Sequence, residues 1–242
     1  MPCSESSARV TPGAVANRAL GKALYPAGHP FAPRANPEAL VDALSLEDLR
    51  RFHGESIRPD IVKLFVVGDT TLEEITRELE RVFGDWKAPA HSALAVPAIP
   101  PVAVPDRARF ILIDWPEEKQ TQIVAGRFVV PAGGDDARLL NAANDILGGS
   151  TTARLGQRLR VEKGWTYGIS SATDGGLVQQ YWGLSASVQT ERAAEAVREI
   201  VGVMSSLTGP QPGTKEELAR FVRNHSRSLP GTFESVDALL GA

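Results

Sequence analysis

Hydrophobic and polar positions along this chain follow two spacings, one typical of helices and one of strands, with breaks at glycine and proline. In the first part they predict a helix after Ser45, a β-branched strand over 61–67 and a helix after Thr70 or Thr71. Ser45 is followed three residues later by an acid, which is a capping-box pattern. Residues 88–105 contain five prolines among alanines, so we expect an extended linker and a domain boundary there.

The pattern restarts after this linker. It predicts strands over 110–113 and 121–130, a helix over 138–147, a short helix to Arg160 capped by Thr151 or Thr152, strands over 167–173 and 181–189, and helices over 191–207 and 214–228. The tight hairpin between the last two strands favours antiparallel pairing. We therefore expect an α+β fold with helices packed on one face of an antiparallel sheet.

The order of elements divides the chain into parts. Residues 1–23 are poor in bulky apolar side chains, so we expect a flexible start. Residues 24–87 run as helix, strand and helix, like the back half of a unit similar to the one over 106–242. The second unit is expected to be truncated at its end, and the two together would be an internal duplication.

Composition and charge exclude few functions. Hydrophobic residues make up 43% and charged residues 23% of the 242 residues, which is ordinary for a globular protein. A net charge of −3 gives no electrostatic case for nucleic-acid binding. No apolar run is long enough to span a membrane, and the start shows no signal-peptide pattern. The compartment stays open between the periplasm and the cytoplasm of a bacterium.

Four stretches of the chain resemble one known family. Three of them are similar to the back half of the catalytic-type repeat in the pitrilysin and insulinase zinc metallopeptidases, the inverzincins: ALYPAGHPFA, LSLEDLRRFHGESIRPDIVKLFVVGD and ERVFGDW. ILGGSTTARLGQRLRVEKGWTYG is similar to the signature of that family's second repeat, which binds no metal. The resemblance extends over nearly the whole chain after the first dozen residues.

The zinc motif of this family is absent from the sequence. The family binds zinc through H-x-x-E-H on a helix, whereas the four histidines here, at 29, 53, 91 and 225, are far apart. The first matching stretch begins beyond the place of that motif, so no metal ligand is assigned to this chain. The resemblance implies zinc in the complete enzyme, none bound by this chain, and no peptide hydrolysis by the chain alone.

The resemblance does imply four site residues. Arg160 and Tyr167 would bind the scissile carbonyl of a peptide and stabilise its oxyanion, while Gly148 and Gly149 would let the peptide approach the backbone. Without the resemblance, Arg160 would be a surface arginine on an exposed helix face shared with Arg154 and Arg158. Tyr167 would be a half-buried strand residue, and the two glycines a helix stop.

Two functional hypotheses remain open at this point. The chain is either the substrate-orienting half of a zinc metalloendopeptidase or a non-catalytic scaffold or interaction subunit of the same family. In the first case its partners are a peptide or protein substrate and a zinc-bearing repeat, located upstream or on a separate chain. A homo- or hetero-dimer is expected because half a repeat leaves an apolar face uncovered.

Overall fold

The computed structural model describes residues 11–33, 37–90, 98–130, 134–175 and 179–241. The chain forms two compact units, which differ in how much apolar surface they bury. The first unit comprises residues 1–33 and 99–223, and the second comprises residues 34–98 and 224–242. One of the three junctions between the units, at residues 98 and 99, falls within residues 88–105, whereas the division into parts expected from the sequence stays a prediction. Residues 91–97 lie outside the described ranges.

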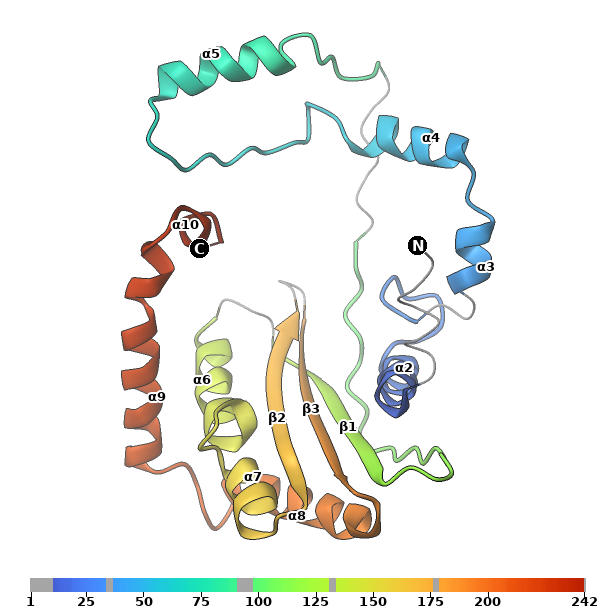
Figure 1. The fold of residues 1–242 in the computed structure, drawn as a ribbon, viewed down its shortest axis with the longest axis vertical. Coiled ribbons are helices and arrows are strands. Elements are labelled where there is room, and N and C mark those ends of the chain that lie inside the picture. The colour runs from blue at the N-terminus through green and yellow to red at the C-terminus, as the bar shows by residue number, and fades with distance from the viewer. Residues whose placement is uncertain (1–10, 34–36, 91–97, 131–133, 176–178, 242) are drawn as a thin grey trace. The chain divides into compact units, whose positions relative to one another are not determined.

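The first unit is built on an antiparallel sheet (Figure 1). Its strands are β1 (Gln120–Val129), β2 (Thr166–Gly175) and β3 (Gln180–Gln189), in the spatial order β1-β3-β2. β3 pairs antiparallel with both neighbours. The hairpin of β2 and β3 was predicted from the sequence, as was β1, and these predictions are confirmed.

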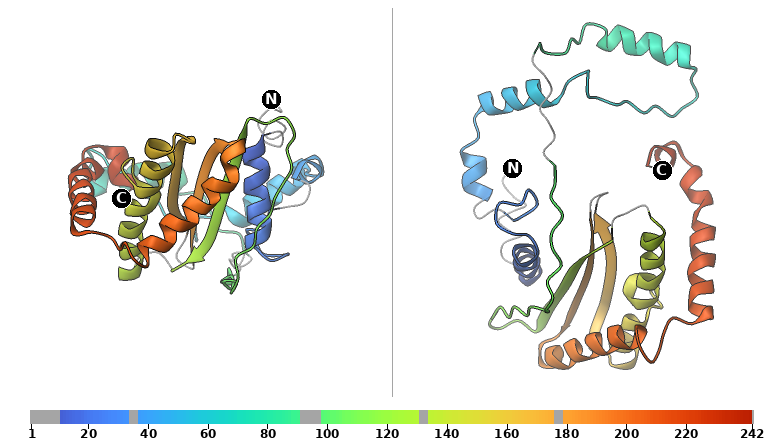
Figure 2. Two further views of the ribbon diagram at one scale, coloured as in Figure 1. Left: turned by 90° about the horizontal axis from the view of Figure 1, so that it is seen from below. Right: turned by 180° about the vertical axis from the view of Figure 1, so that it is seen from behind.

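Helical segments pack against one face of this sheet (Figures 1 and 2). They are α6 (Asp135–Asn144), the π-helical segment η1 (Asp145–Gly149), α7 (Arg154–Gly156), the π-helical segment η2 (Gln157–Glu162), the 3-10 turn η3 (Thr190–Arg192) and α8 (Ala193–Leu207). Alternate side chains of β3 face this layer and form the core with residues of η1, α7, η2 and α8. The core residues are Leu147, Leu155, Leu159, Trp182, Leu184, Ala186, Val188, Ala196 and Ile200. The predicted α+β arrangement is confirmed.

An additional helix contacts β1 at the edge of the sheet. This helix, α2 (Pro12–Leu24), begins at Thr11, whose side chain accepts a hydrogen bond from the Ala14 amide. After it, the Tyr25 ring packs edge-on against Phe128 of β1 at 5.1 Å. The sequence predicted a loosely held segment up to residue 23, because small alanines carry little apolar signal, yet residues 12–24 form a helix beside the sheet.

The second unit contains helices whose described residues include no buried hydrophobic side chain. They are α3 (Pro37–Asp42), α4 (Leu46–Ser56), α5 (Leu72–Phe83), the 3-10 turn η4 (Pro230–Phe233) and α10 (Val236–Gly241), while α9 (Lys215–Ser228) extends from the first unit into the second. Ser45 and Thr71 cap α4 and α5 with capping boxes, as predicted. Neither helix buries any residue, so their apolar stripes are exposed to solvent.

Two predicted strands and one predicted cap were wrong. Residues 61–67 and 110–113 are not strands, and Phe65 and Leu112 are 75% and 95% exposed. A strand exists only when a neighbour pairs with its backbone, and the structure pairs neither segment within the described ranges. The helix expected to begin at Thr151 or Thr152 begins instead after Ala153, which offers no side-chain cap.

Candidate functional site

The four predicted site residues lie on neighbouring elements of the first unit. Gly148 and Gly149 end η1, Arg160 belongs to η2, and Tyr167 is the second residue of β2. Both π-helical segments contact β2. π-Helical turns are rare and occur frequently at functional sites, because the extra residue changes the direction of nearby side chains.

Arg154, which lies between the two glycines and Arg160 in the chain, is held in a partly buried ion pair with Glu217. Its Nε and Nη2 atoms donate to the two carboxylate oxygens of Glu217 at 2.8 and 2.7 Å. Nη2 also donates to the carbonyl of Pro212 at 2.9 Å, and Nη1 to that of Gln211. The hydrogen bonds from Arg154 lower the pKa of Glu217 to about 2. This arginine fastens α9 to α7 and is not available to a ligand.

Arg158 is likewise engaged with acids. Its Nε and Nη2 atoms donate to the Glu199 carboxylate at 2.7 and 3.1 Å, and Nη1 donates to Glu162 at 2.6 Å. Hydrogen bonds to Glu199 and then to Glu162 raise the pKa of Arg158. The interpretation of the three arginines as one exposed helix face was therefore wrong for Arg154, whose side chain is 19% exposed, whereas Arg158 lies at the surface with its guanidinium engaged by two acids.

Arg160 differs from both neighbours. It is exposed, and within the part of the chain that the structure describes its guanidinium makes no ion pair and no hydrogen bond. The residue before it, Leu159, is fully buried in the core, so the backbone that carries Arg160 is fixed. A charged group on a fixed backbone, with its donors unused, can bind an external acceptor.

Tyr167 is also turned outward. Its side chain is 87% exposed, and no described residue forms a hydrogen bond with its hydroxyl. The other two tyrosines are partly buried, and burial raises the pKa values of Tyr25 and Tyr181. The alternative interpretation of Tyr167 as a half-buried strand aromatic was therefore wrong.

The backbone just before this tyrosine is anchored through Trp165 to both η2 and β3. The Trp165 amide donates to the Leu159 carbonyl at 3.0 Å, and the Trp165 carbonyl accepts the Gln189 amide at 3.0 Å. Gly164, with a φ of 66°, makes the turn between η2 and β2 in a conformation that favours glycine. This short connection places Arg160 and Tyr167 on two contacting elements.

Gly148 and Gly149 lie where a side chain would collide with neighbouring residues of the fold. A Cβ atom on Gly148 would lie 2.6 Å from Ser171 Oγ, and one on Gly149 would lie 2.7 Å from Asn144 Nδ2. Gly148 is buried and Gly149 is exposed. Their lack of side chains lets η1 pack closely against β2 and against the end of α6, whereas a role in peptide binding remains a prediction.

Sequence reasoning missed a polar network beneath the two glycines. Asn144 Oδ1 accepts hydrogen bonds from Ser171 Oγ at 2.6 Å and Trp182 Nε1 at 2.8 Å, while Asn144 Nδ2 donates to the Ser171 carbonyl at 3.0 Å. Ser171 and Trp182 are buried. A single Asn in a helical segment gives no sequence signal for such a network, because its partners lie on β2 and β3.

No described residues form a metal site. The described part of the chain contains no group of three or more His, Cys, Asp or Glu side chains that could hold a metal ion. His29 Nε2 donates to the Pro100 carbonyl at 3.1 Å, and His53 lies in the last turn of α4. His91 lies outside the described residues. The donors among the described residues therefore do not form a site for the zinc that the sequence resemblance implies for the complete enzyme.

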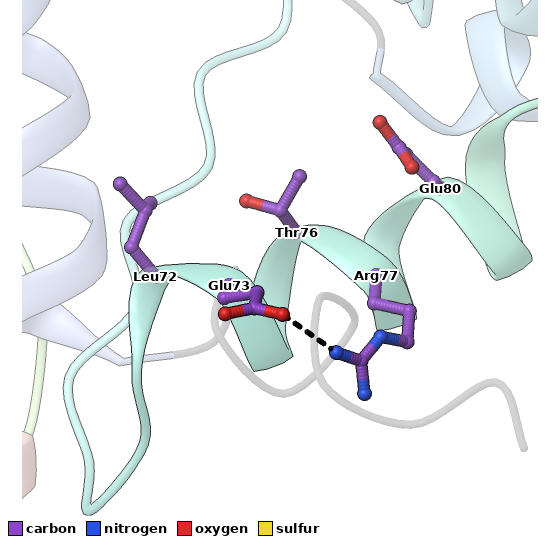
Figure 3. A pocket seen from close by; sticks show the side chains of 5 residues that line it. All are labelled: Leu72, Glu73, Thr76, Arg77 and Glu80. Atoms are coloured by element: carbon purple, nitrogen blue, oxygen red, sulfur yellow. Dashed lines mark hydrogen bonds and ion pairs between the residues drawn. The ribbon is translucent and has the colours of Figure 1, made fainter.

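A shallow depression occurs elsewhere, on α5 of the second unit (Figure 3). It is lined by Leu72, Glu73, Thr76, Arg77 and Glu80. Glu73 and Arg77 face each other across one helical turn, with 3.0 Å between Oε1 and Nη2 (Figure 3). All lining residues belong to one helix and none is a predicted site residue, so this depression forms no part of the candidate site.

Whether a helix can span a membrane depends on its length and its hydropathy. No helix within the described ranges is both long enough and apolar enough to cross a bilayer.

Known structures and sequences resemble this chain. A crystal structure of a peptidase M16 inactive domain from Pseudomonas fluorescens superposes with a TM-score of 0.84 at 22% identity, covering 98% of this chain and 55% of that one. A protease from Helicobacter pylori superposes with a TM-score of 0.73 at 21% identity, covering 83% and 48%. At these identities the likeness concerns the fold.

A sequence relative has a zinc protease description. It is YmxG of Bacillus subtilis strain 168, described as an uncharacterized zinc protease, and it is 24% identical over 197 residues. The match covers 80% of this chain and 46% of YmxG, so the chain spans about half the length of the relatives it matches.

The family model of the peptidase M16 inactive domain matches residues 43–224, which is more than half of the chain. The matched range includes parts of both units and all four predicted site residues. The resemblance to the zinc metallopeptidases, and to their non-metal half, is thereby confirmed. This chain belongs to the peptidase M16 family and carries its inactive domain.

Proposed function

We propose that this chain supplies the substrate-orienting and oxyanion-stabilising half of a zinc metalloendopeptidase site. The observation that carries the proposal is that Arg160 and Tyr167 are exposed without side-chain partners among the described residues, whereas the neighbouring arginines are not free. Arg154 and Arg158 are engaged by acids, whereas Arg160 and Tyr167 are exposed, make no side-chain bonds to described residues and lie on contacting elements. Two outward donors on an anchored backbone are what recognition of a peptide carbonyl requires.

The chemistry of the pair suits a developing negative charge. The guanidinium of Arg160 carries a permanent charge and several donors, and the phenol of Tyr167 adds one directed donor. Both would donate to the oxygen of the scissile carbonyl, and both bonds strengthen as that oxygen gains charge in the transition state. Because the described residues form no zinc site, the metal and its ligands belong to another half of the enzyme in this proposal.

The partner in this proposal is a zinc-bearing repeat, upstream in the same polypeptide or on a separate chain. The relatives support it, because they are about twice as long as the stretch they share with this chain. The substrate would be a peptide or protein that lies between the two halves. The chain alone is then expected to hydrolyse no peptide.

The test is substitution of the two donors in the complete two-half enzyme. Arg160→Ala and Tyr167→Phe should each lower kcat by about 100- to 1000-fold, the usual loss for one oxyanion donor. Arg198→Ala is the matched control, since Arg198 is exposed on α8 and makes no ion pair with a described residue. It should leave kcat unchanged. Full activity in an Arg160→Ala/Tyr167→Phe double variant would reject the proposal.

The alternative is a non-catalytic scaffold or interaction subunit. The observation in its favour is the exposed apolar surface of α4 and α5, which suits an interface better than a catalytic cleft. Under this alternative the complex would require the chain for assembly, and the double variant would assemble and work normally. The same experiment therefore separates the two functions.

A further inference from the structure

A β-bulge sets the direction of Tyr167. Thr166 is opposite Val188 on β3, and Ile169 is opposite Ala186, with a register irregularity between Thr166 and Ile169. Two residues of β2, Tyr167 and Gly168, therefore share a stretch in which β3 has only Ser187. Such a bulge interrupts the alternation of side chains along a strand and redirects the side chain at that point.

The hydroxyl of Thr166 lies at the centre of this bulge. Its single hydrogen can be donated to the carbonyl of Ser187 at 2.6 Å or to that of Gly168 at 2.8 Å. The same oxygen accepts the amide of Gly168 at 3.1 Å. Thr166 is 8% exposed, so one buried hydroxyl bridges the two strands and ties together the residues on either side of Tyr167.

This arrangement fastens the tyrosine backbone without touching the phenol. Ahead of Thr166, the Trp165 amide and carbonyl are bound to Leu159 and Gln189. After it, the Gly168 amide is bound to the Thr166 hydroxyl. The side chain of Tyr167 projects into solvent from between these anchors, with 87% of its surface exposed.

We propose that Thr166 is a positioning residue that holds the bulge and thereby aims the phenol of Tyr167 at the substrate carbonyl. The inference rests on the proposed function of Tyr167, and it assigns to Thr166 an effect that acts only through that phenol. The hydroxyl rather than the shape of Thr166 matters, since its three contacts are all hydrogen bonds with backbone groups. Valine at this position keeps the shape and removes the bonds.

The first measurement is amide hydrogen exchange of the chain itself. Thr166→Val should raise the exchange rate of the Gly168 amide by about tenfold, which corresponds to the loss of one ordinary hydrogen bond. Thr166→Ser, which keeps the hydroxyl, should restore slow exchange. Thr166→Ala replaces the valine variant if the latter does not fold. An unchanged Gly168 amide in a folded Val or Ala variant would overturn the inference.

The second measurement is a double-mutant cycle on kcat in the complete enzyme. Thr166→Val should lower kcat by about 10- to 100-fold through misplacement of the phenol, with KM little changed. In a Tyr167→Phe background the same substitution should cost nothing further, because no hydroxyl remains to be placed. Ser171→Ala removes another buried hydroxyl of β2, and its effect should be the same in both backgrounds.

The outcomes separate this inference from the function on which it rests. If Tyr167→Phe has no effect, the proposed function fails. If Tyr167→Phe is damaging and Thr166→Val costs as much with phenylalanine at 167 as with tyrosine, the function stands and Thr166 is only structural. Coupling between the two positions, with rescue by serine, is the result expected for a positioning residue.

Discussion

Three arginines within seven residues have three different environments. The sequence places Arg154, Arg158 and Arg160 on the same predicted short helix, and no neighbouring residue in the sequence distinguishes them. Their acids are remote, since Glu199 is 41 residues from Arg158 and Glu217 is 63 residues from Arg154. Sequence reasoning could therefore select Arg160 only through a family resemblance, whereas the structure distinguishes it by its lack of an acid partner among the described residues.

The Arg154–Glu217 pair makes stability depend on pH. Because the folded pKa of Glu217, about 2, lies below its ordinary value, the pair contributes its stability above about pH 4.5. That contribution is lost as pH falls from 4.5 towards 2. At pH 7, Glu217→Gln should lower the free energy of unfolding by about 2 kcal/mol, and the difference from the unmodified chain should shrink below pH 4.

Urea unfolding at a series of pH values measures this difference. Glu195→Gln is a suitable control, since Glu195 lies at the surface with its oxygen 3.9 Å from Arg192. It should change stability by less than about 0.5 kcal/mol. A gap between the Glu217 variant and the unmodified chain that stays constant from pH 7 to pH 3 would contradict the assignment.

Three helix starts that depend on a local capping signal were predicted correctly, whereas the one expected at Thr151 or Thr152 was not. Ser45, Thr71 and Thr214 each cap the helix expected of them, because a cap needs only residues three positions apart. Strand pairing is not local, and this is why residues 61–67 and 110–113 were mistaken for strands. Their β-branched composition fits a strand, but composition cannot supply a neighbour.

The junction of η1 and β2 gives a test at the level of elements. Gly148→Ala would place a Cβ atom 2.6 Å from Ser171 Oγ and 3.2 Å from Leu155 Cδ1. Overpacking of this kind should lower the free energy of unfolding by about 1 to 3 kcal/mol. Thermal unfolding followed by circular dichroism measures the loss.

Gly156→Ala is the matched control for this test. Gly156 lies in α7 with ordinary room around it, its nearest contact for a Cβ atom being the Thr151 carbonyl at 3.9 Å. Alanine there should be neutral or stabilising by up to about 1 kcal/mol, because it lowers the conformational entropy of the unfolded chain. If both substitutions had the same effect, close packing would not be the reason for Gly148.

The whole chain shows an uneven distribution of buried surface. The core belongs to the first unit, whereas the second unit exposes most of its large apolar side chains. Those on α4, α5 and the segment between them are Leu46, Leu49, Phe52, Ile57, Ile61, Val62, Leu64, Phe65, Val66, Leu72, Val82 and Phe83. Apolar surface of this extent marks an interaction site.

We expect the chain to associate through this surface, with itself or with a zinc-bearing repeat. Sedimentation velocity over a range of concentrations should show a concentration-dependent dimer or larger species. Phe65→Glu together with Leu49→Glu should weaken it, because both side chains are more than half exposed. Leu139→Glu on α6 changes an exposed leucine of the other unit and should not. A chain that stays monomeric at the highest concentration would contradict this expectation.

The π-helical character of η2 has a consequence for how this segment tolerates changes of length. A π-turn holds one residue more than an α-turn, and each residue of an α-helix advances the direction of its side chain by about 100°. Removal of one residue from η2 would let the segment revert to α-helical winding, yet Leu159 would have to stay in the core. Arg160 would then rotate away from its present direction although every charge in the segment was kept. The segment is therefore constrained in its number of residues as strictly as in their identity, and a single-residue deletion within η2 should turn Arg160 away while Leu159 stays in the core.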